Sequence, residues 1–336
     1  MPGLPTGCRG QGPATRLPRL LPPPVAALRD RLRSISSAVG ETRQHVDDAT
    51  ERLSRQLQAL QLQVEETTNV HQREMARTRE ILRAICDREP WQRERLSALR
   101  AEERYAASFV EPEPLVSVVI PTFENQRLLR ERAIPSVLAQ TYQNFEIVVV
   151  GDDAPDETRA AVESFGDARL RYSSLLYRGP YPTDALSRWY VAGVPPYNEA
   201  VRLAQGLWIA PLDDDDAFRP EHIERLLRSA QSERLEFVYG TMERRDPDGA
   251  TSVLGRFPPE HSHFGLQSAL YHAGIAEIFE LELTDWLFDL PYDWGLAQRM
   301  LRSGVRMKMI PEINVDYYPS KLWGPRDGSP PLSPPE

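Results

Sequence analysis

The sequence predicts an α/β domain with a mainly parallel sheet, preceded by one long helix. The apolar runs at 115–120 and 145–150 lack the alternation of half-exposed strands, so they indicate strands buried on both faces. Segments with helical periodicity, at 127–140 and 156–165, follow these runs, as in a sheet built with helical crossovers. The long helix is predicted over 25–87, which has no internal proline and a single glycine.

The remaining elements of the predicted sheet follow the same alternation. We expect a short strand at 169–173, a helix at 197–205, a strand at 207–212 and a helix at 220–232. Ligands of parallel sheets bind at the carboxyl ends of the strands. Three strand ends carry unusual residues here: Pro-Thr-Phe-Glu, Gly-Asp-Asp and a run of four aspartates. We therefore expect the functional site at this edge.

The N-terminal helix carries a heptad pattern. With Val25 as position a, most a positions are apolar, but fewer of the d positions are. Leu57, Val64, Met75 and Leu82 indicate that the apolar stripe drifts from a 3.5-residue repeat toward 3.6. We expect a coiled-coil helix that makes a parallel dimer or trimer. The alternative is a helix that folds back on the globular domain.

Composition and patterning divide the chain into four parts. Residues 1–24 and 319–336 are rich in proline and are expected to be disordered tails. Residues 25–110 hold the long helix, a shorter one at 91–107 and the start of a linker whose Glu-Pro-Glu-Pro lies at 111–114. The globular domain is predicted over 111–318.

Charge, hydropathy and cysteine usage exclude several classes of protein. The 336 residues carry a net charge of −9, which does not favour nucleic acid as the main partner. No apolar run reaches the length of a membrane helix, and the N-terminus has no apolar region typical of a secretory signal. Two cysteines cannot form a disulfide framework, so we expect a cytoplasmic protein.

The four consecutive aspartates, Asp213 to Asp216, are the strongest chemical signal. Adjacent carboxylates repel one another, and a divalent cation such as Mn²⁺ or Mg²⁺ would offset that repulsion. Such a cation often bridges to a phosphorylated substrate. The alternative is a solvated acidic turn that caps the helix after Pro220.

Three further residues are candidates for binding or catalysis. Asp152 could accept a hydrogen bond from the imide N–H of uracil or thymine, or it could cap the helix near residue 156. Phe123 could stack on a base or pack in the core. Asp293, at the start of a helix, could serve as a general base or as a helix cap. We interpret His261 and His263 as surface residues, and no zinc pattern, Walker-type loop or Gly-x-Ser-x-Gly elbow is present.

Taken together, these motifs resemble the inverting family 2 glycosyltransferases with the GT-A fold, in particular soluble ones similar to spore-coat glycosyltransferases. The resemblance covers roughly residues 115–318. It rests on an ordered set of segments at 116–125, 136–153, 197–216, 237–240 and 293–304.

The resemblance implies a role for individual positions. Pro121 and Phe123 correspond to the residues that hold the nucleotide base, and Asp152 corresponds to the base-binding aspartate. Asp213 and Asp215 match the Asp-x-Asp pair, with Asp215 as the metal ligand. Asp214 then lies near the ribose, and Asp293 is the catalytic base.

Two departures from the family pattern affect the expected site. Tyr292 stands where the family usually has Glu, and Tyr197-Asn198 replaces its Arg-Asn. We expect Arg188 to supply positive charge to the diphosphate instead. Trp286, Tyr292 and Trp294 surround the expected base; they could stack on sugar rings at an acceptor site or pack between helix and sheet.

The expected function is metal-dependent transfer of a sugar from a nucleotide-diphosphate sugar, with UDP or dTDP favoured, to the hydroxyl of a glycan, peptide or small molecule. Processive membrane synthases are excluded because membrane helices and a Gln-x-x-Arg-Trp motif are absent from the sequence. Two alternatives remain: nucleotidyl transfer, which lacks its glycine-rich loop here, and a degenerate transferase domain that serves as a coiled-coil scaffold.

Overall fold

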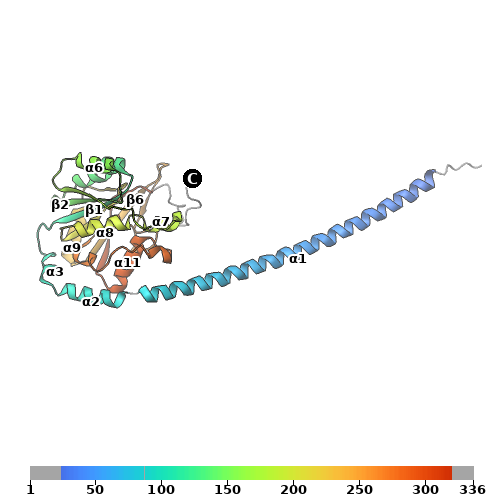
Figure 1. Cartoon of the computed structure of the whole chain (residues 1–336), viewed down its shortest axis with the longest axis horizontal. Coiled ribbons are helices and arrows are strands. Elements are labelled where there is room, and N and C mark those ends of the chain that lie inside the picture. The colour runs from blue at the N-terminus through green and yellow to red at the C-terminus, as the bar shows by residue number, and fades with distance from the viewer. Residues whose placement is uncertain (1–23, 87, 320–336) are drawn as a thin grey trace, which may run out of the picture. The chain divides into compact units, whose positions relative to one another are not determined.

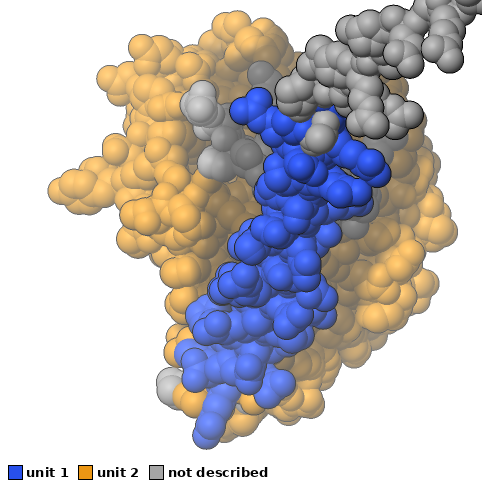
Figure 2. Space-filling view, turned by 90° about the vertical axis from the view of Figure 1, so that its right-hand side faces the viewer, with its two compact units in different colours: residues 1–78 blue, residues 79–336 orange. Residues whose placement is uncertain are grey.

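The computed structural model describes residues 24–86 and 88–319 (Figure 1). The tails expected at 1–24 and 319–336 therefore lie almost wholly outside the described residues. The chain divides into two compact units, residues 1–78 and 79–336, which have different colours in Figure 2. The second unit begins well before residue 111, where the sequence pattern placed the start of the globular domain.

The described part of the first unit is helical throughout. Helix α1 runs from Pro24 to Cys86 without a break, so the predicted long helix is confirmed. The apolar residues of its stripe, such as Leu32 and Leu53, are exposed to 60% and 63%. The helix thus presents an apolar stripe that no part of the first unit covers, and its self-association stays a prediction.

The second unit is built on a nine-stranded mixed sheet with the order β3-β2-β1-β4-β8-β6-β9-β5, in which β7 pairs with β6. The predicted parallel arrangement holds for β3, β2, β1 and β4. Strand β8 pairs antiparallel with both β4 and β6, whereas β6 and β9 are parallel. The strands are β1 (Val116–Thr122), β2 (Phe145–Gly151), β3 (Leu170–Ser174), β4 (Trp208–Pro211), β5 (Ala217–Phe218), β6 (Phe237–Arg245), β7 (Thr251–Leu254), β8 (Ala269–His272) and β9 (Met307–Tyr317).

Helices cover both faces of the sheet, and the alternation of side chains along β1 shows it. Val118 and Ile120 enter one apolar cluster, with α5 (Ile134–Leu138) and α9 (His222–Glu233). Val119 points the other way, into a cluster with α8 (Val194–Leu203) and α11 (Tyr292–Ser303). Because both faces are buried, these strands are continuous apolar runs, as the sequence predicted. The other helices are α6 (Asp156–Glu163), α7 (Ala185–Val191), α10 (Ala273–Ala276), η2 (Leu266–Ser268) and η3 (Asp285–Phe288).

The helix predicted at 127–140 contains a π-helical turn. It begins as α4 (Gln126–Leu128), widens over Leu129–Ala133 and ends as α5. Pro135 lies just after the wide turn and cannot donate a backbone hydrogen bond to the preceding turn, which is a common cause of such an irregularity.

The second predicted helix, at 91–107, is two helices. α2 (Glu89–Arg100) and α3 (Glu103–Ala107) are separated by a turn, and both belong to the second unit. They are held to the sheet by Glu236, which is fully buried and directly precedes β6.

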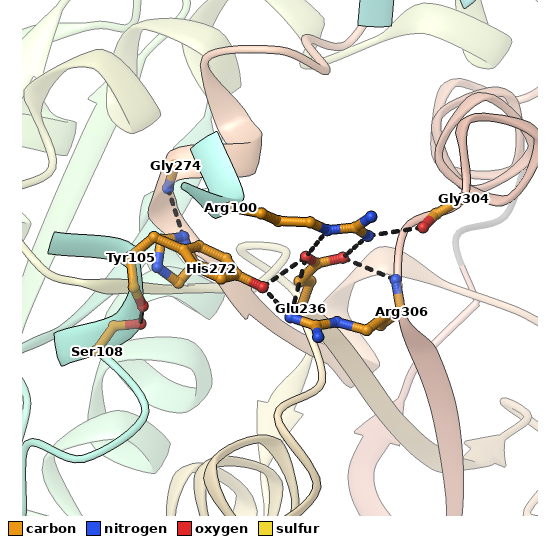
Figure 3. A network of polar contacts seen from close by, with 8 residues as sticks. All are labelled: Arg100, Tyr105, Ser108, Glu236, His272, Gly274, Gly304 and Arg306. Carbon is orange, nitrogen blue, oxygen red and sulfur yellow. Dashed lines mark hydrogen bonds and ion pairs between the residues drawn. The ribbon is translucent and has the colours of Figure 1, made fainter. Parts of the chain in front are cut away.

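Glu236 is the centre of a buried polar network (Figure 3). Its two carboxylate oxygens accept hydrogen bonds from Arg100 at 2.7 and 2.8 Å, and one also accepts from the hydroxyl of Tyr105 at 2.6 Å. The backbone N–H of Arg306, at the edge of β9, donates to the other oxygen at 2.8 Å. Burial alone would raise the pKa of Glu236, but the hydrogen bonds from Arg100 and Tyr105 lower it, so the carboxylate stays charged.

Candidate active site

A cavity of about 360 Å³ lies at the carboxyl ends of β1, β2 and β4. β1 pairs in parallel with both neighbours, so the segments that follow the three strands meet at one edge, as expected. The start of α11 closes the cavity from the other half of the sheet. The predicted site residues that line it are Pro121, Phe123, Asp152, Arg188, Asp213, Asp214, Asp215, Tyr292, Asp293 and Trp294.

The four consecutive aspartates divide between the cavity and the protein interior. Asp214 lines the cavity and accepts hydrogen bonds from Thr122 at 2.6 Å and from the amide of Asn125 at 2.9 Å. Asp216 is fully buried, where Gln267 donates to it at 3.0 Å and the backbone N–H of Tyr318 at 2.7 Å. The run therefore does not form the solvated acidic turn that was the alternative interpretation.

Burial raises the pKa of the aspartate carboxyl groups that line the cavity. For Asp215 burial and then the charge of Asp214 raise the pKa to about 6. For Asp213 burial is again the largest cause, followed by Asp215 and Asp214, and its pKa lies well above the ordinary value. A bound cation would relieve both the burial of charge and the mutual repulsion.

The donor atoms of this cluster fit a hard divalent cation, since carboxylate oxygens are the ligands that Mg²⁺ and Mn²⁺ prefer. Within residues 24–86 and 88–319, no group of three His, Cys, Asp or Glu side chains is arranged as a ligand set. Asp213 and Asp215 would therefore hold a metal together with ligands from a substrate or water, an arrangement usual for Mg²⁺.

Asp293 lies in the first turn of α11 and is not its N-cap residue. The N-cap residue is Pro291, and no side chain caps this helix. One carboxylate oxygen of Asp293 accepts from the backbone N–H of Trp294 at 2.7 Å. Burial raises the pKa of Asp293 to about 6, close to the value that suits a general base at neutral pH.

Asp152, at the end of β2, is buried and does not cap a helix. The N-cap residue of α6 is Pro155, without a side-chain hydrogen bond. The two carboxylate oxygens of Asp152 accept from the backbone N–H of Gly179 at 3.0 Å and from the hydroxyl of Tyr181 at 2.6 Å. Asp152 thus joins the end of β2 to a loop that the sequence had not linked to it.

The aromatic residues expected at the site do not all reach it. Phe123 is half-buried on the cavity wall, beneath the guanidinium of Arg178, whose central carbon lies 3.7 Å from the ring centre. Tyr292 and Trp294 line the cavity, but Trp286 does not. Trp286 lies in the short helix η3 and packs against the apolar cluster that includes α8 and α11. It does not line this cavity, and its role in acceptor binding stays a prediction.

Several lining residues were not predicted, because they lie in loops or in the short helix α7 and have no local signal. Arg178, Tyr181 and Trp189 come from the segment before α8. His261, interpreted as a surface residue, is exposed, but it lines the cavity and its ring centre lies 5.5 Å from that of Trp294. His263 is not among the lining residues.

The residues that replace the family's Arg-Asn lie away from the cavity. Tyr197 is buried, and its hydroxyl is hydrogen-bonded to that of Tyr271. The side chain of Asn198 bonds to both backbone groups of Leu281, at 2.9 and 3.2 Å. Neither residue can supply charge to a ligand, so any cation for a bound anion must come from another segment.

No helix among the described residues combines the length and the apolarity that a membrane span requires.

Comparison with known proteins finds similarity to glycosyltransferases. The profile described as "Glycosyl transferase family 2" matches residues 117–179 and 196–281. One relative is the UDP-Glc:alpha-D-GlcNAc-diphosphoundecaprenol beta-1,3-glucosyltransferase WfgD of Escherichia coli. The two sequences are 32% identical over 143 residues, and these residues make up 43% of this chain and 50% of that protein. This chain is 30% identical over 227 residues to the succinoglycan biosynthesis protein ExoO of Rhizobium meliloti, 61% of each chain. The chain thus spans about half the length of the first of these relatives.

Among solved structures, Staphylococcus aureus TarS 1–349 in complex with UDP-GlcNAc is similar, with 16% identity and a TM-score of 0.49 over 61% of this chain and 59% of that one.

Proposed function

Because this chain carries a family 2 glycosyltransferase domain, we propose that its cavity transfers a sugar from a nucleotide-diphosphate sugar to an acceptor hydroxyl, with inversion at the anomeric carbon. One observation carries the proposal. Asp293 and the carboxylates of Asp213 to Asp215 line the same cavity although they come from the two halves of the sheet. A general base and a carboxylate cluster that could hold a cation for the diphosphate thus line one cavity, which is large enough for a substrate.

Asp293 is the proposed general base. Its carboxylate takes the proton of the acceptor hydroxyl while that oxygen forms a bond to the anomeric carbon. The bond from that carbon to the diphosphate oxygen breaks, and its electron pair leaves with the nucleoside diphosphate. Burial supports this role, since it raises the pKa of Asp293 toward neutral pH and makes the carboxylate a stronger base.

Asp213 and Asp215 are the proposed ligands of Mn²⁺ or Mg²⁺. When bound, such a cation neutralises the charge that develops on the leaving diphosphate. Pro121, Phe123 and Asp152 would hold the base, and Asp214 would contact the ribose, as the resemblance implies. UDP or dTDP is favoured because Asp152 can accept from the imide N–H that uracil and thymine share.

Tyr292 and Trp294 are proposed to contact the acceptor. Both lie beside Asp293 at the start of α11, and the ring of Trp294 lies near that of His261. Aromatic faces of this kind bind the apolar face of a sugar ring while a polar edge reaches its hydroxyls. A glycan, a peptide or a small molecule with a free hydroxyl remains within the class of acceptor.

We also propose that the protein forms a homo-oligomer, a parallel dimer or trimer, through α1. The apolar stripe from Val25 to Val64 follows the spacing of a coiled coil, and all its described side chains are exposed. Light scattering of the full chain at micromolar concentration tests this. A strictly monomeric mass contradicts it, and a variant with Leu32, Val39 and Val46 changed to Lys should become monomeric.

The donor site is tested first by a thermal-shift panel of UDP, dTDP, GDP and CMP, each with Mn²⁺ and with EDTA. We expect a metal-dependent rise in Tm for one pyrimidine diphosphate, because a ligand that binds the native state stabilises it. Release of that diphosphate from its sugar derivatives then measures turnover. If no nucleotide shifts Tm, the proposal fails and the scaffold alternative gains support.

A further inference from the structure

Residues 178–193, here called the inserted arm, form the cavity wall that faces the acidic cluster. Most of the arm falls between the two segments that match the family, since residues 180–195 are unmatched. The arm contains α7 and contributes Arg178, Tyr181, Arg188 and Trp189 to the cavity. The family profile therefore does not cover this wall beyond Gly179.

Asp152 holds the beginning of the arm. It accepts from the backbone N–H of Gly179 and from the hydroxyl of Tyr181, and that hydroxyl in turn accepts from the backbone N–H of Gly193 at 3.3 Å. The chain packs closely at Gly179, where a Cβ atom would come within 2.6 Å of the ring of Pro195. One buried carboxylate and one tyrosine thus fix both ends of the arm.

The arm carries the arginines of the cavity. Arg178 lies over the ring of Phe123, and Arg188 donates to the backbone carbonyl of Thr183 at 2.9 Å. Over the described ranges, no carboxylate lies within 4.0 Å of either guanidinium. Both arginines line the cavity, and no described carboxylate competes there with a bound anion for their guanidinium groups.

The carboxylates of the cavity favour the presence of such cations when an anion binds. Five carboxylates line it, and they would repel a diphosphate: Asp152, Asp213, Asp214, Asp215 and Asp293. The position at which the resemblance would place an arginine is Tyr197, whose hydroxyl is engaged in the core. Guanidinium groups bind phosphate oxygens through charge-assisted hydrogen bonds.

We propose that the inserted arm binds the diphosphate of the donor through Arg178 and Arg188, and that Tyr181 positions both arginines through its hydrogen bond to Asp152. This inference rests on the proposed function, because it takes the cavity as the donor site. It adds Arg178 and Tyr181 to the site and makes Asp152 the anchor of the arm.

The test compares UDP with uridine on the full-length protein at saturating Mg²⁺. Dissociation constants are measured for the wild type, Arg178→Ala and Arg188→Ala by ligand-observed NMR, which covers weak binding. We expect each variant to lose about 10-fold or more in affinity for UDP and to keep its affinity for uridine, since only UDP carries the phosphates. Arg228→Ala, on the exposed face of α9 and away from the cavity, is the control for net charge.

Unchanged UDP binding in both arm variants overturns the inference and leaves the proposed function intact. An equal loss for uridine and UDP also overturns it, because the arginines would then act on the nucleoside. A wild type that binds neither ligand overturns the inference and the proposed donor site together.

Tyr181→Phe tests the positioning role, since it removes only the hydroxyl that links Asp152 to the arm. We expect a selective loss of affinity for UDP of the same kind, with uridine binding and Tm close to those of the wild type. A fall in Tm with equal weakening of both ligands would assign Tyr181 a purely structural role and overturn that part of the inference.

Discussion

The two halves of the sheet contribute to the cavity in different ways. The parallel half, β3-β2-β1-β4, supplies the carboxyl ends of three strands, and these carry Phe123, Asp152 and the aspartate run. The other half supplies a helix start with Asp293 and the side wall with Gln267 and the end of β9. The first set belongs to the proposed donor site and the second to the proposed acceptor site. Variants in the two halves should therefore affect different steps.

Asp293→Asn should give the largest effect on turnover and none on donor binding. Loss of a general base lowers the transfer rate by about 10²- to 10⁴-fold. The metal-dependent rise in Tm with nucleotide should remain, because the strand ends of the parallel half are intact. Asp289→Asn is a matched control: Asp289 is exposed, and asparagine tolerates its left-handed conformation, with φ of 54°. Loss of nucleotide binding in Asp293→Asn would contradict the division between the halves.

Asp215→Asn should impair both binding and turnover, since the proposed metal serves both. We expect turnover to fall by about 10²- to 10³-fold and the Mn²⁺-dependent thermal shift to disappear. Titration with Mn²⁺ in the presence of the nucleotide measures the loss of metal binding. Misfolding is tested separately, because the variant without metal should be at least as stable as the wild type without metal. Unchanged turnover at low Mn²⁺ would remove the metal assignment.

Glu236→Ala should destabilise the second unit without a direct effect on the site. Removing one partner of a buried ion pair leaves the others unpaired, so we expect the free energy of unfolding to fall by about 3 kcal/mol. Urea denaturation measures it. Glu163→Ala breaks an exposed i,i+4 pair with Arg159 and should cost at most about 0.5 kcal/mol. Equal effects of the two changes on the free energy of unfolding would show that the network around Glu236 stabilises the second unit no more than an exposed ion pair does.

Turnover should depend on pH through Asp293. Its pKa of about 6 implies that the base becomes protonated below that pH, so kcat/KM should fall up to tenfold per pH unit on the acidic side. A series of rates from pH 5 to 8 at saturating Mn²⁺ tests this. A rate that stays constant down to pH 5 would show that another group, or none, accepts the proton.

The stability of the metal-free protein should show the opposite trend. Asp215 and Asp293 have a pKa of about 6 in the folded state, above the ordinary value of 3.8, so the folded protein binds more protons between these values. The contribution of these two groups to stability is therefore largest below about pH 4 and is lost as the pH rises through about 6. Tm measured between pH 5 and 7.5 should fall in EDTA, and Mn²⁺ should reduce that fall.

The same division between the halves explains what the sequence predicts well. The runs at 115–120, 145–150 and 207–212 are local signals, because a strand buried on both faces must be apolar throughout. Their topology then brings Asp152 and the aspartate run to one edge. Those parts of the fold and of the site could therefore be predicted from residues that are neighbours in the sequence.

The rest depends on contacts between distant segments. β9 contains Pro311 and an exposed Glu312, so it has no apolar run to identify it. No local pattern shows that Trp294 lines the cavity whereas Trp286 packs against the apolar core. The role of Tyr181 depends on a hydrogen bond across 29 residues, for which no local pattern exists.

The division of the four aspartates has a consequence for how such sequences are compared. Asp214 is fixed from the side of β1, whereas Asp216 is fixed by Gln267 and the end of β9. A chain with one aspartate deleted would still contain Asp-x-Asp, yet it would lose the carboxylate that joins this loop to the far half of the sheet. The number of consecutive aspartates therefore matters as well as the Asp-x-Asp motif. The fourth aspartate indicates a structural connection between this loop and the far half of the sheet, which a three-residue motif does not include.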